Sequence, residues 1–328
     1  MRTAAIAVAS LALAACNGSS TSSISLPGDP APAAPLCVSS SCGTKTVLLD
    51  IPSAENLFFT DTGRLFVSGS ENVYEITRDG AGAFQATPIF DGTGNFGGIA
   101  QIGDVLYVNG FDTGGLYAAR LTATPQLAEI HALGLGSPNG LTAGPDGELY
   151  IVNGPIPSGS LPDPKIVKVR LDPADPLKVL DQADWLVGAP LTFPNGIQRR
   201  ARTLYFAESD TTSVTFGSIR TVEVLPDGSA GEPQTLGTFD SIADDLGLAG
   251  DQVLIAYYSS NQLALMGANG SILQTTDPLS FDNPSSVRLG RPPLFAANQL
   301  VVTEKGVVGL PPTPGYGNVL SVFTPNPP

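Results

Sequence analysis

The stretch Ser137–Asn153, SPNGLTAGPDGELYIVN, decides how the rest of the chain is interpreted. It contains a polar start with Asn139, a central Asp146-Gly147 pair, and a final apolar run LYIV. An Asp-Gly pair between two strand-like runs is a strong signal for an antiparallel hairpin. The same pattern recurs around Asn195, in FPNGIQRRARTLYFAE. The chain is therefore predicted to repeat one hairpin, with a side-chain amide at the same point of each copy.

Similar hairpins begin at six places, near residues 55, 98, 139, 195, 244 and 285. Neighbouring starts are 41 to 56 residues apart, which is the period of a four-stranded propeller blade. We therefore predict an all-β protein over residues 44–328, a six-bladed β-propeller of four-stranded blades. The lone strand at residues 46–51 is expected to pair with the last blade and close the ring.

Blade three has the longest interval and therefore has room for an insertion. Its outer strand is expected at Lys165–Val169, and residues 172–188 are predicted to form a helical turn around Trp185. We interpret the Trp185 ring as packing rather than as a surface on which a substrate stacks.

The composition supports an all-β class and excludes some partners. The 328 residues include 37 Gly and 29 Pro, and no long apolar run has helical spacing. The net charge is −14, from 30 acidic and 16 basic residues, without a Lys/Arg cluster of the kind that neutralises phosphates. The chain is therefore not expected to bind nucleic acid. We expect a monomer.

Residues 1–15 have the features of an export signal that is too short to span a membrane. This segment ends in Leu-Ala-Ala-Cys, which looks like a bacterial lipobox with Cys16 as the lipidated residue. The alternative is a plain signal peptide with an incidental cysteine. With lipidation, the protein is anchored to a membrane of the cell envelope through Cys16. Asn17 after the cysteine resembles the pattern of lipoproteins sent to the outer membrane.

Residues 16–43 are predicted to be a flexible tether rich in Ser, Pro and Ala. Cys37 and Cys42 lie at its end. In an exported chain, this spacing favours a small disulfide loop over a metal site, because no further Cys or His lies nearby.

Residues at the start of equivalent inner strands converge at one end of a propeller. In blade order these residues are Glu55, Gly97, Asn139, Asn195, Asp244 and Ser285. A carboxylate or amide oxygen from Glu55, Asn139, Asn195 and Asp244 would make an oxygen-only site suited to Ca²⁺ or another divalent cation. The alternative is that these residues are ordinary turn-forming residues at the starts of strands.

The repeats also resemble a known family. The order of SAENLFF, SPNGLTAGPDGELYIVN, FPNGIQRRARTLYFAE and ADDLGLAGDQVLIA resembles the SMP-30/gluconolactonase family of calcium-dependent propeller lactonases. The blade-six text PSSVRLGRPPLFAANQLVVTE is similar to the last repeat of that family. The resemblance covers residues 44 to 323 and implies that Glu55, Asn195 and Asp244 hold the ion. It also implies that Asn139 contacts the substrate or a water on the ion, and that Asp244 is the general base.

The chain departs from the family pattern at one position. Gluconolactonases usually have an Arg two residues before the blade-three Asn, and this chain has Ser137 there. The resemblance therefore does not extend to sugar-lactone specificity. Paraoxonase-like lactonases share the scaffold, and the doublets Glu55-Asn56 and Asp244-Asp245 are similar to their paired polar residues.

Two functional hypotheses follow. The first is a calcium-dependent hydrolase of a lactone or related ester, in which Asp244 activates water. This hydrolase would not rely on histidine, because the single His131 is interpreted as an ordinary strand residue. The second is a non-catalytic extracytoplasmic propeller that binds a protein or glycan partner.

Overall fold

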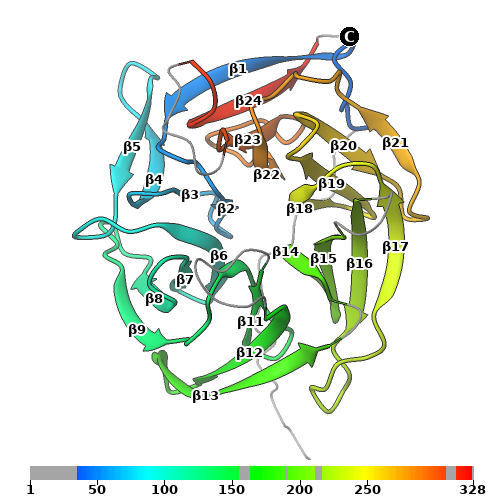
Figure 1. Ribbon diagram of the computed structural model, residues 1–328. Helices are drawn as coiled ribbons and strands as arrows, with labels where there is room; N and C mark the ends of the chain where they lie inside the picture. The colour runs from blue at the N-terminus through cyan, green and yellow to red at the C-terminus, as the bar shows by residue number, and fades with distance from the viewer. Residues whose placement is uncertain (1–34, 155–162, 189–190, 211–215, 308–314, 327–328) are drawn as a thin grey trace, which may run out of the picture.

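The computed structural model describes residues 35–154, 163–188, 191–210, 216–307 and 315–326. These residues form six four-stranded antiparallel sheets arranged around a central axis (Figure 1). The predicted fold, a six-bladed β-propeller of four-stranded blades, is confirmed. The described part of the chain has no helix whose length and hydropathy would suit a membrane span.

In each of the first five blades, the four strands follow one another in the chain. Blade one contains β2 (Leu57–Phe59), β3 (Leu65–Ser68), β4 (Val73–Arg78) and β5 (Phe84–Pro88). Blade two contains β6 (Phe96–Ile102), β7 (Val105–Gly110), β8 (Gly115–Arg120) and β9 (Ala128–Ala132). Blade three contains β10 (Pro138–Ala143), β11 (Leu149–Asn153), β12 (Lys165–Asp172) and β13 (Asp175–Val187). Blade four contains β14 (Phe193–Arg200), β15 (Thr203–Ser209), β16 (Gly217–Glu223) and β17 (Gln234–Phe239). Blade five contains β18 (Ala243–Ala249), β19 (Gln252–Tyr257), β20 (Gln262–Met266) and β21 (Ile272–Thr275).

Blade six joins the two ends of the propeller. It contains β22 (Pro284–Leu289), β23 (Leu300–Glu304) and β24 (Val319–Pro325), and its outermost strand is β1 (Gly43–Asp50). β1 pairs antiparallel with β24 from Gly43 opposite Pro325 to Asp50 opposite Val319, as the blue and red strands in Figure 1 show. The predicted closure of the ring by the first strand is confirmed.

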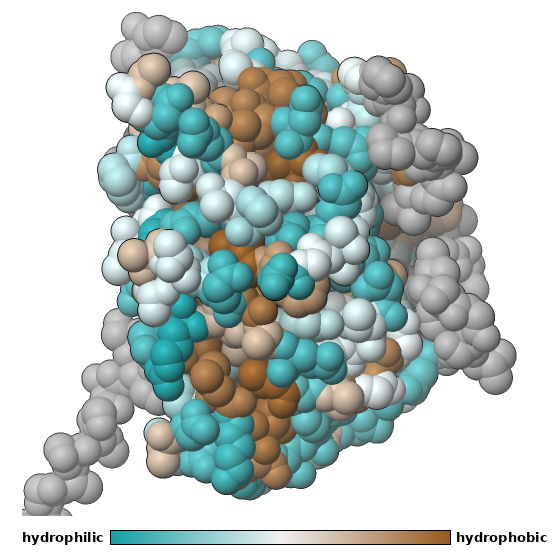
Figure 2. Space-filling view, turned by 90° about the vertical axis from the view of Figure 1, so that its left-hand side faces the viewer, coloured by the Kyte–Doolittle hydropathy of each residue, from teal (hydrophilic) through white to brown (hydrophobic). Residues whose placement is uncertain are grey.

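The hydrophobic core is divided among the interfaces between blades. Six clusters of buried hydrophobic residues are found among the described residues, and each lies between two neighbouring blades. The cluster between blades two and three, for example, packs Tyr107 and Leu116 against Ile151 and Val167. On the side formed by β5 and β9, Figure 2 shows patches of hydrophobic side chains separated by hydrophilic ones.

The structure corrects the prediction for blade three. Residues 172–188 do not form a helical turn, because most of this segment is β13, the outermost strand. Lys165–Val169 belongs to the third strand, β12. Register shifts at three points of the β12–β13 pairing interrupt the regular alternation by which a strand is recognised in sequence. The packing role of Trp185 is confirmed: its ring lies edge-on to Tyr150 at 4.6 Å, and its Nε1 donates to the Gly228 carbonyl at 3.0 Å.

The segment before β1 is packed against the propeller. Leu36 and Val38 are buried in the cluster between blades five and six. The Val38 amide donates to the Gln274 side chain at 2.8 Å, and a disulfide bond joins Cys37 to Cys42. This part of the predicted tether is therefore attached to blade five. The predicted signal peptide and Cys16 lie outside the described residues.

Candidate functional site

The first strands of the six blades surround the axis, and each contacts the first strand of the next blade around the ring. Five of them, β6, β10, β14, β18 and β22, have a register shift near the start, at the positions where polar residues were predicted to converge. A bulge of this kind breaks the alternation of side chains between the two faces and re-aims a side chain. The recurrent polar residues therefore lie at one end of the inner strands, which we call the axial ring.

The glycine that follows Asn139 and the glycine that follows Asn195 are both required by close packing. A Cβ atom on Gly140 would lie 2.8 Å from the backbone nitrogen of Ile197, in the next blade. A Cβ atom on Gly196 would lie 2.5 Å from the Cα atom of Asp245, again in the next blade. Real Cβ contacts are essentially never this short. The Asn-Gly pair thus combines an amide in the axial ring with a residue that lets neighbouring inner strands approach.

All four predicted ion ligands lie in the axial ring and are 5% to 9% exposed. Glu55 lies two residues before the first residue of β2, Asn139 is the second residue of β10, Asn195 is the third of β14 and Asp244 is the second of β18. Asn195 donates Nδ2 to Asp244 Oδ1 at 2.5 Å. The Oδ1 atom of Asn195 is buried without a hydrogen-bond partner.

Glu55 is held by blade six and is close enough to Asp244 to affect it. Ser285, the blade-six position of the ring, donates its hydroxyl to the Glu55 carbonyl at 2.7 Å. Burial raises the pKa of Asp244 to about 8, and the charge of Glu55 adds to this rise. The charge of Lys305 and the hydrogen bond from the Asn195 amide both act to lower the pKa of Asp244.

Lys305 is a ring residue that sequence reasoning missed. It follows β23 directly, and its Nζ atom forms an ion pair with Glu55 Oε2. Burial opposes the charged form of Lys305, but the carboxylates of Glu55 and Asp244 raise its pKa above the ordinary value. The axial ring therefore contains one ammonium beside its two carboxylates. In every antiparallel hairpin, the end of the second strand lies beside the start of the first. The residues that follow each second strand, such as Lys305, could therefore have been searched for polar side chains.

A second layer of polar residues lies next to the ring and is centred on Asp245. Its Oδ2 atom accepts hydrogen bonds from Asn56 Nδ2 at 3.0 Å, Ser286 Oγ at 2.8 Å and Arg288 Nη2 at 2.8 Å. Asp245 and Arg288 form a buried ion pair, with both side chains 4% exposed. The two aspartates of the doublet thus have different surroundings: Asp244 contacts a ring amide, and Asp245 is neutralised by an arginine.

The donor set fits a hard cation such as Ca²⁺. The candidate ligands offer only carboxylate and amide oxygens, and Asn195 Oδ1 is a buried oxygen that still lacks a partner. Within the described ranges, no group of three or more His, Cys, Asp or Glu residues is arranged to hold a metal. Amide oxygens would therefore have to complete the site around Glu55 and Asp244.

His131 lies away from the axial ring. It belongs to β9, the outermost strand of blade two, and its Nε2 atom lies 3.1 Å from Gln182 Oε1 in blade three. The prediction that it is an ordinary strand residue is confirmed.

The fold and the axial ring define a six-bladed propeller with polar side chains at one end of its inner strands. No protein-family model matches the chain. A search of curated proteins also gives no match.

Solved structures with the same fold include a gluconolactonase, a regucalcin and a luciferin-regenerating enzyme. A gluconolactonase from Xanthomonas campestris is similar at 17% identity and a TM-score of 0.62, over 92% of this chain and 98% of that chain. The calcium-binding protein regucalcin from Agrobacterium tumefaciens is similar at 15% identity and a TM-score of 0.61, over 89% of this chain and 95% of that chain. A luciferin-regenerating enzyme is similar at 13% identity and a TM-score of 0.61, over 86% of this chain and 95% of that chain. At these identities the similarity shows a shared fold.

Proposed function

We propose that the chain is a calcium-dependent hydrolase of a lactone or related ester. The observation that carries this proposal is the convergence of Glu55, Asn195 and Asp244 in the axial ring, with the buried Asn195 Oδ1 left unpartnered. Asn139 occupies the equivalent position in blade three. Gluconolactonase activity and calcium binding are named for two of the proteins that share the fold, and this agrees with the proposal.

In this proposal, Asp244 is the general base and Asn195 is its positioning partner. Calcium, when bound, supplies a positive charge that polarises an ester carbonyl. The Asn195 amide holds Asp244 Oδ1, which leaves Oδ2 to accept a proton from water. The water oxygen bonds to the carbonyl carbon, the ring C–O bond breaks, and the departing alkoxide takes the proton back. Asn139 would contact the substrate from the neighbouring blade.

The reaction is tested with a panel of small γ- and δ-lactones and simple acetate esters. The full-length protein with Ca²⁺ is expected to hydrolyse at least one of them, and Asp244→Ala to reduce its turnover by about 100-fold or more. Asp251→Ala, in the exposed turn between β18 and β19, is the matched control and should retain activity. Circular dichroism verifies that each variant is folded. Equal turnover in the wild type and Asp244→Ala would exclude Asp244 as the base.

Calcium binding is tested separately by thermal unfolding in EDTA and in excess Ca²⁺. At 100 times its Kd, an ion stabilises the folded state by about 2.7 kcal/mol, which raises the midpoint by several degrees. The wild type and Asn269→Ala, a change in an exposed turn, should show this rise, and Asn195→Ala should not. If Ca²⁺ raises the unfolding midpoint of none of the three proteins, the polar residues of the axial ring are ordinary turn residues at strand starts, and no ion is bound there.

One observation favours the second candidate function, a non-catalytic propeller that binds a protein or glycan. The Lys305 ammonium already neutralises Glu55 in the axial ring. This candidate predicts that Asp244→Ala is folded and that no lactone or ester in the panel is turned over by either protein.

We also propose that Cys16, which lies outside the described residues, anchors the protein to the cell envelope. The support is the Leu-Ala-Ala-Cys sequence before the tether. In a bacterium that processes lipoproteins, the wild type should incorporate labelled palmitate and enter the detergent phase on phase separation. Cys16→Ser should do neither, and label in both proteins would place the lipid elsewhere.

A further inference from the structure

The residue that follows the second strand occupies an equivalent position in blades two, three, five and six. Its backbone amide donates to the carbonyl of the residue just before the first strand of the same blade, at 2.7 to 3.0 Å. The four residues, which we call the mouth residues, are Phe111, Gly154, Tyr258 and Lys305. Because Lys305 lies in the axial ring, the shared geometry places the other three at the same end of the inner strands.

The Phe111 side chain extends toward blade six. Its ring centroid lies 6.0 Å from Lys305 Nζ, and the same Nζ atom pairs with Glu55 in the axial ring. Blade one lies between blades two and six (Figure 1). The residue that follows the second strand of blade one is Gly69, so no side chain at that position separates Phe111 from Lys305. The Phe111 ring therefore borders the axial ring itself.

Phe111 does not take part in the hydrophobic core. It is half-buried, and none of the six clusters of buried hydrophobic residues found in the described ranges includes it. Other aromatic residues of the same blade, such as Phe96 and Tyr117, pack edge-on against each other in the core. The Phe111 ring thus offers apolar surface to a molecule that lies over the axial ring.

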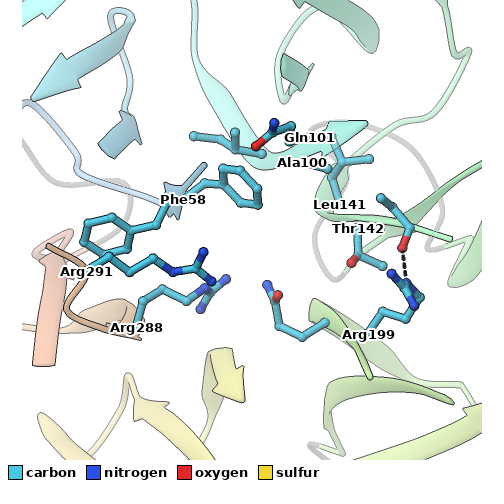
Figure 3. A pocket seen from close by; sticks show the side chains of 12 residues that line it. Phe58, Ala100, Gln101, Leu141, Thr142, Arg199, Arg288 and Arg291 are labelled. Carbon is cyan, nitrogen blue, oxygen red and sulfur yellow. Dashed lines mark hydrogen bonds between the residues drawn. The ribbon is translucent and has the colours of Figure 1, made fainter. Parts of the chain in front are cut away.

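The other end of the inner strands offers little room for a substrate. A pocket there is lined by three arginines, Arg199, Arg288 and Arg291 (Figure 3). Its volume is about 40 Å³, which suits a few waters at about 10–15 Å³ each and is too small for a lactone ring. Arg288 also pairs with the buried Asp245, so its side chain lies between this pocket and the axial ring. A substrate for Asp244 therefore approaches from the ring end, past Phe111.

Blades two and three bring no polar side chain to the mouth position. Phe111 is apolar, and Gly154 has no side chain, since a Cβ atom there would lie 2.5 Å from the Pro194 carbonyl oxygen. Sugar hydroxyls need hydrogen-bond partners, whereas an apolar group is stabilised by contact with an aromatic ring. We propose that Phe111 is a specificity-determining residue that contacts the body of the substrate, so that lactones and esters with an apolar substituent are preferred to sugar lactones. This inference rests on the proposed hydrolase function.

The kinetic test compares γ-phenyl-γ-butyrolactone with γ-methyl-γ-butyrolactone and with glucono-δ-lactone. With Ca²⁺, the full-length wild type should hydrolyse the phenyl lactone with a kcat/KM at least about tenfold above the values for the other two. Phe111→Ala and Phe111→Gln should reduce this preference about tenfold, and Phe111→Tyr should retain it. Leu273→Ala, in the outermost strand β21 and at a position 50% exposed, is the control and should behave like the wild type.

A purely structural role of Phe111, as packing for Lys305, gives a different result. Loss of the ring would then change the turnover of all three lactones by the same factor. That outcome, or a wild type that prefers glucono-δ-lactone, would overturn the proposal and leave the hydrolase function intact. Circular dichroism verifies folding, and the use of both Phe111→Ala and Phe111→Gln guards against one variant that does not fold.

Calorimetric titration with the phenyl and methyl lactones in EDTA tests the contact without turnover. The wild type should bind the phenyl lactone about tenfold more tightly than the methyl lactone, and Phe111→Ala should bind the two with similar Kd values. If no lactone is hydrolysed with Ca²⁺ but this difference in Kd is found, the hydrolase function is wrong and the apolar contact is supported. Equal Kd values for the two lactones in the wild type would overturn the contact.

Discussion

Lys305 places a positive charge in the axial ring, beside the carboxylate of Glu55. Its ammonium pairs with Glu55 while being only 16% exposed, so it repels any second cation that approaches the same carboxylate. At the same time, removing it leaves a buried carboxylate without a partner, a change that destabilises folded proteins by about 3–5 kcal/mol. One side chain therefore stabilises the ion-free ring and opposes ion binding.

Lys305→Met is accordingly expected to lower the unfolding midpoint in EDTA and to bind Ca²⁺ at least about tenfold more tightly than the wild type. Thermal unfolding and calorimetric titration with CaCl₂ measure the two effects. Lys178→Met, at an exposed position paired with Asp172, is the control and should change neither quantity appreciably. An unchanged Kd for Ca²⁺ in Lys305→Met would show that the ammonium and the ion do not compete.

Glu208 is a buried carboxyl near the axial ring, and we expect it to make the stability of the protein depend on pH. Its Oε1 atom accepts hydrogen bonds from the Thr192 amide and hydroxyl and from the Phe193 amide, at 2.5, 2.7 and 2.8 Å. Burial nevertheless raises the pKa of Glu208 above its ordinary value. In the interval between the unfolded and folded pKa, the folded state therefore binds more protons than the unfolded state. Stability from this group is fully present below the unfolded pKa, near 4.3, and is lost as pH rises through the folded pKa.

Glu208→Gln should thus become more stable relative to the wild type as pH is raised from about 4 to 7. Urea unfolding at both pH values measures the difference in free energy of unfolding between the two proteins. Glu232→Gln, at an exposed position, should show no comparable change with pH. A pH-independent difference between wild type and Glu208→Gln would contradict the raised pKa.

The bulges near the start of five of the inner strands both allow close packing between blades and place polar groups in the axial ring. The register shifts from Pro194 to Ile197 in β14, and the glycine inside this bulge faces Asp245 of the next blade. Added volume at such a contact forces neighbouring backbone apart and usually costs about 1–3 kcal/mol.

Gly196→Ala is therefore expected to lower the free energy of unfolding by about 1–3 kcal/mol. Gly80→Ala is the matched control, because nothing lies within 4 Å of the Cβ position at Gly80. Urea unfolding of the two variants measures the difference. Equal stability of the two variants would mean that the inner strands can move apart at little cost.

At the scale of the whole molecule, closure of the ring depends on β1. This strand is supplied from the start of the described chain and completes the last blade by pairing with β24. Without it, blade six would have three strands, and the cluster that joins blades one and six would lose Leu48 and Leu49.

Deletion of residues 43–50 should lower the unfolding midpoint markedly and broaden the transition, because the ring is then open at one blade. Val47→Asp is the control: Val47 lies in β1 but is 51% exposed, so the substitution should leave the transition nearly unchanged. Differential scanning calorimetry distinguishes these results. A deletion variant that unfolds like the wild type would show that closure contributes little to stability.

The inner and second strands were the most predictable elements, and the outermost strands the least. The inner strands are buried on both sides, so they appear as apolar runs with polar starts, as in β10 and β18. The outermost strands β9, β13 and β21 have few buried positions and so carry little hydrophobic signal. This difference is why the number of blades was predicted and the fourth strand of blade three was missed.

The repeat, the number of blades, the closure by the first strand and the equivalent positions of the four candidate ligands could all be predicted from the amino-acid sequence. These features are repeated along the chain, and repetition is visible without coordinates. The three-dimensional arrangement was needed to show that Lys305 pairs with Glu55, that Asp245 is neutralised by Arg288, and that three arginines share a pocket at the other end of the inner strands. Each of these contacts joins residues of different blades or strands, at positions that do not recur along the chain. Such contacts depend on how the blades close around the axis, so no local pattern in the sequence records them.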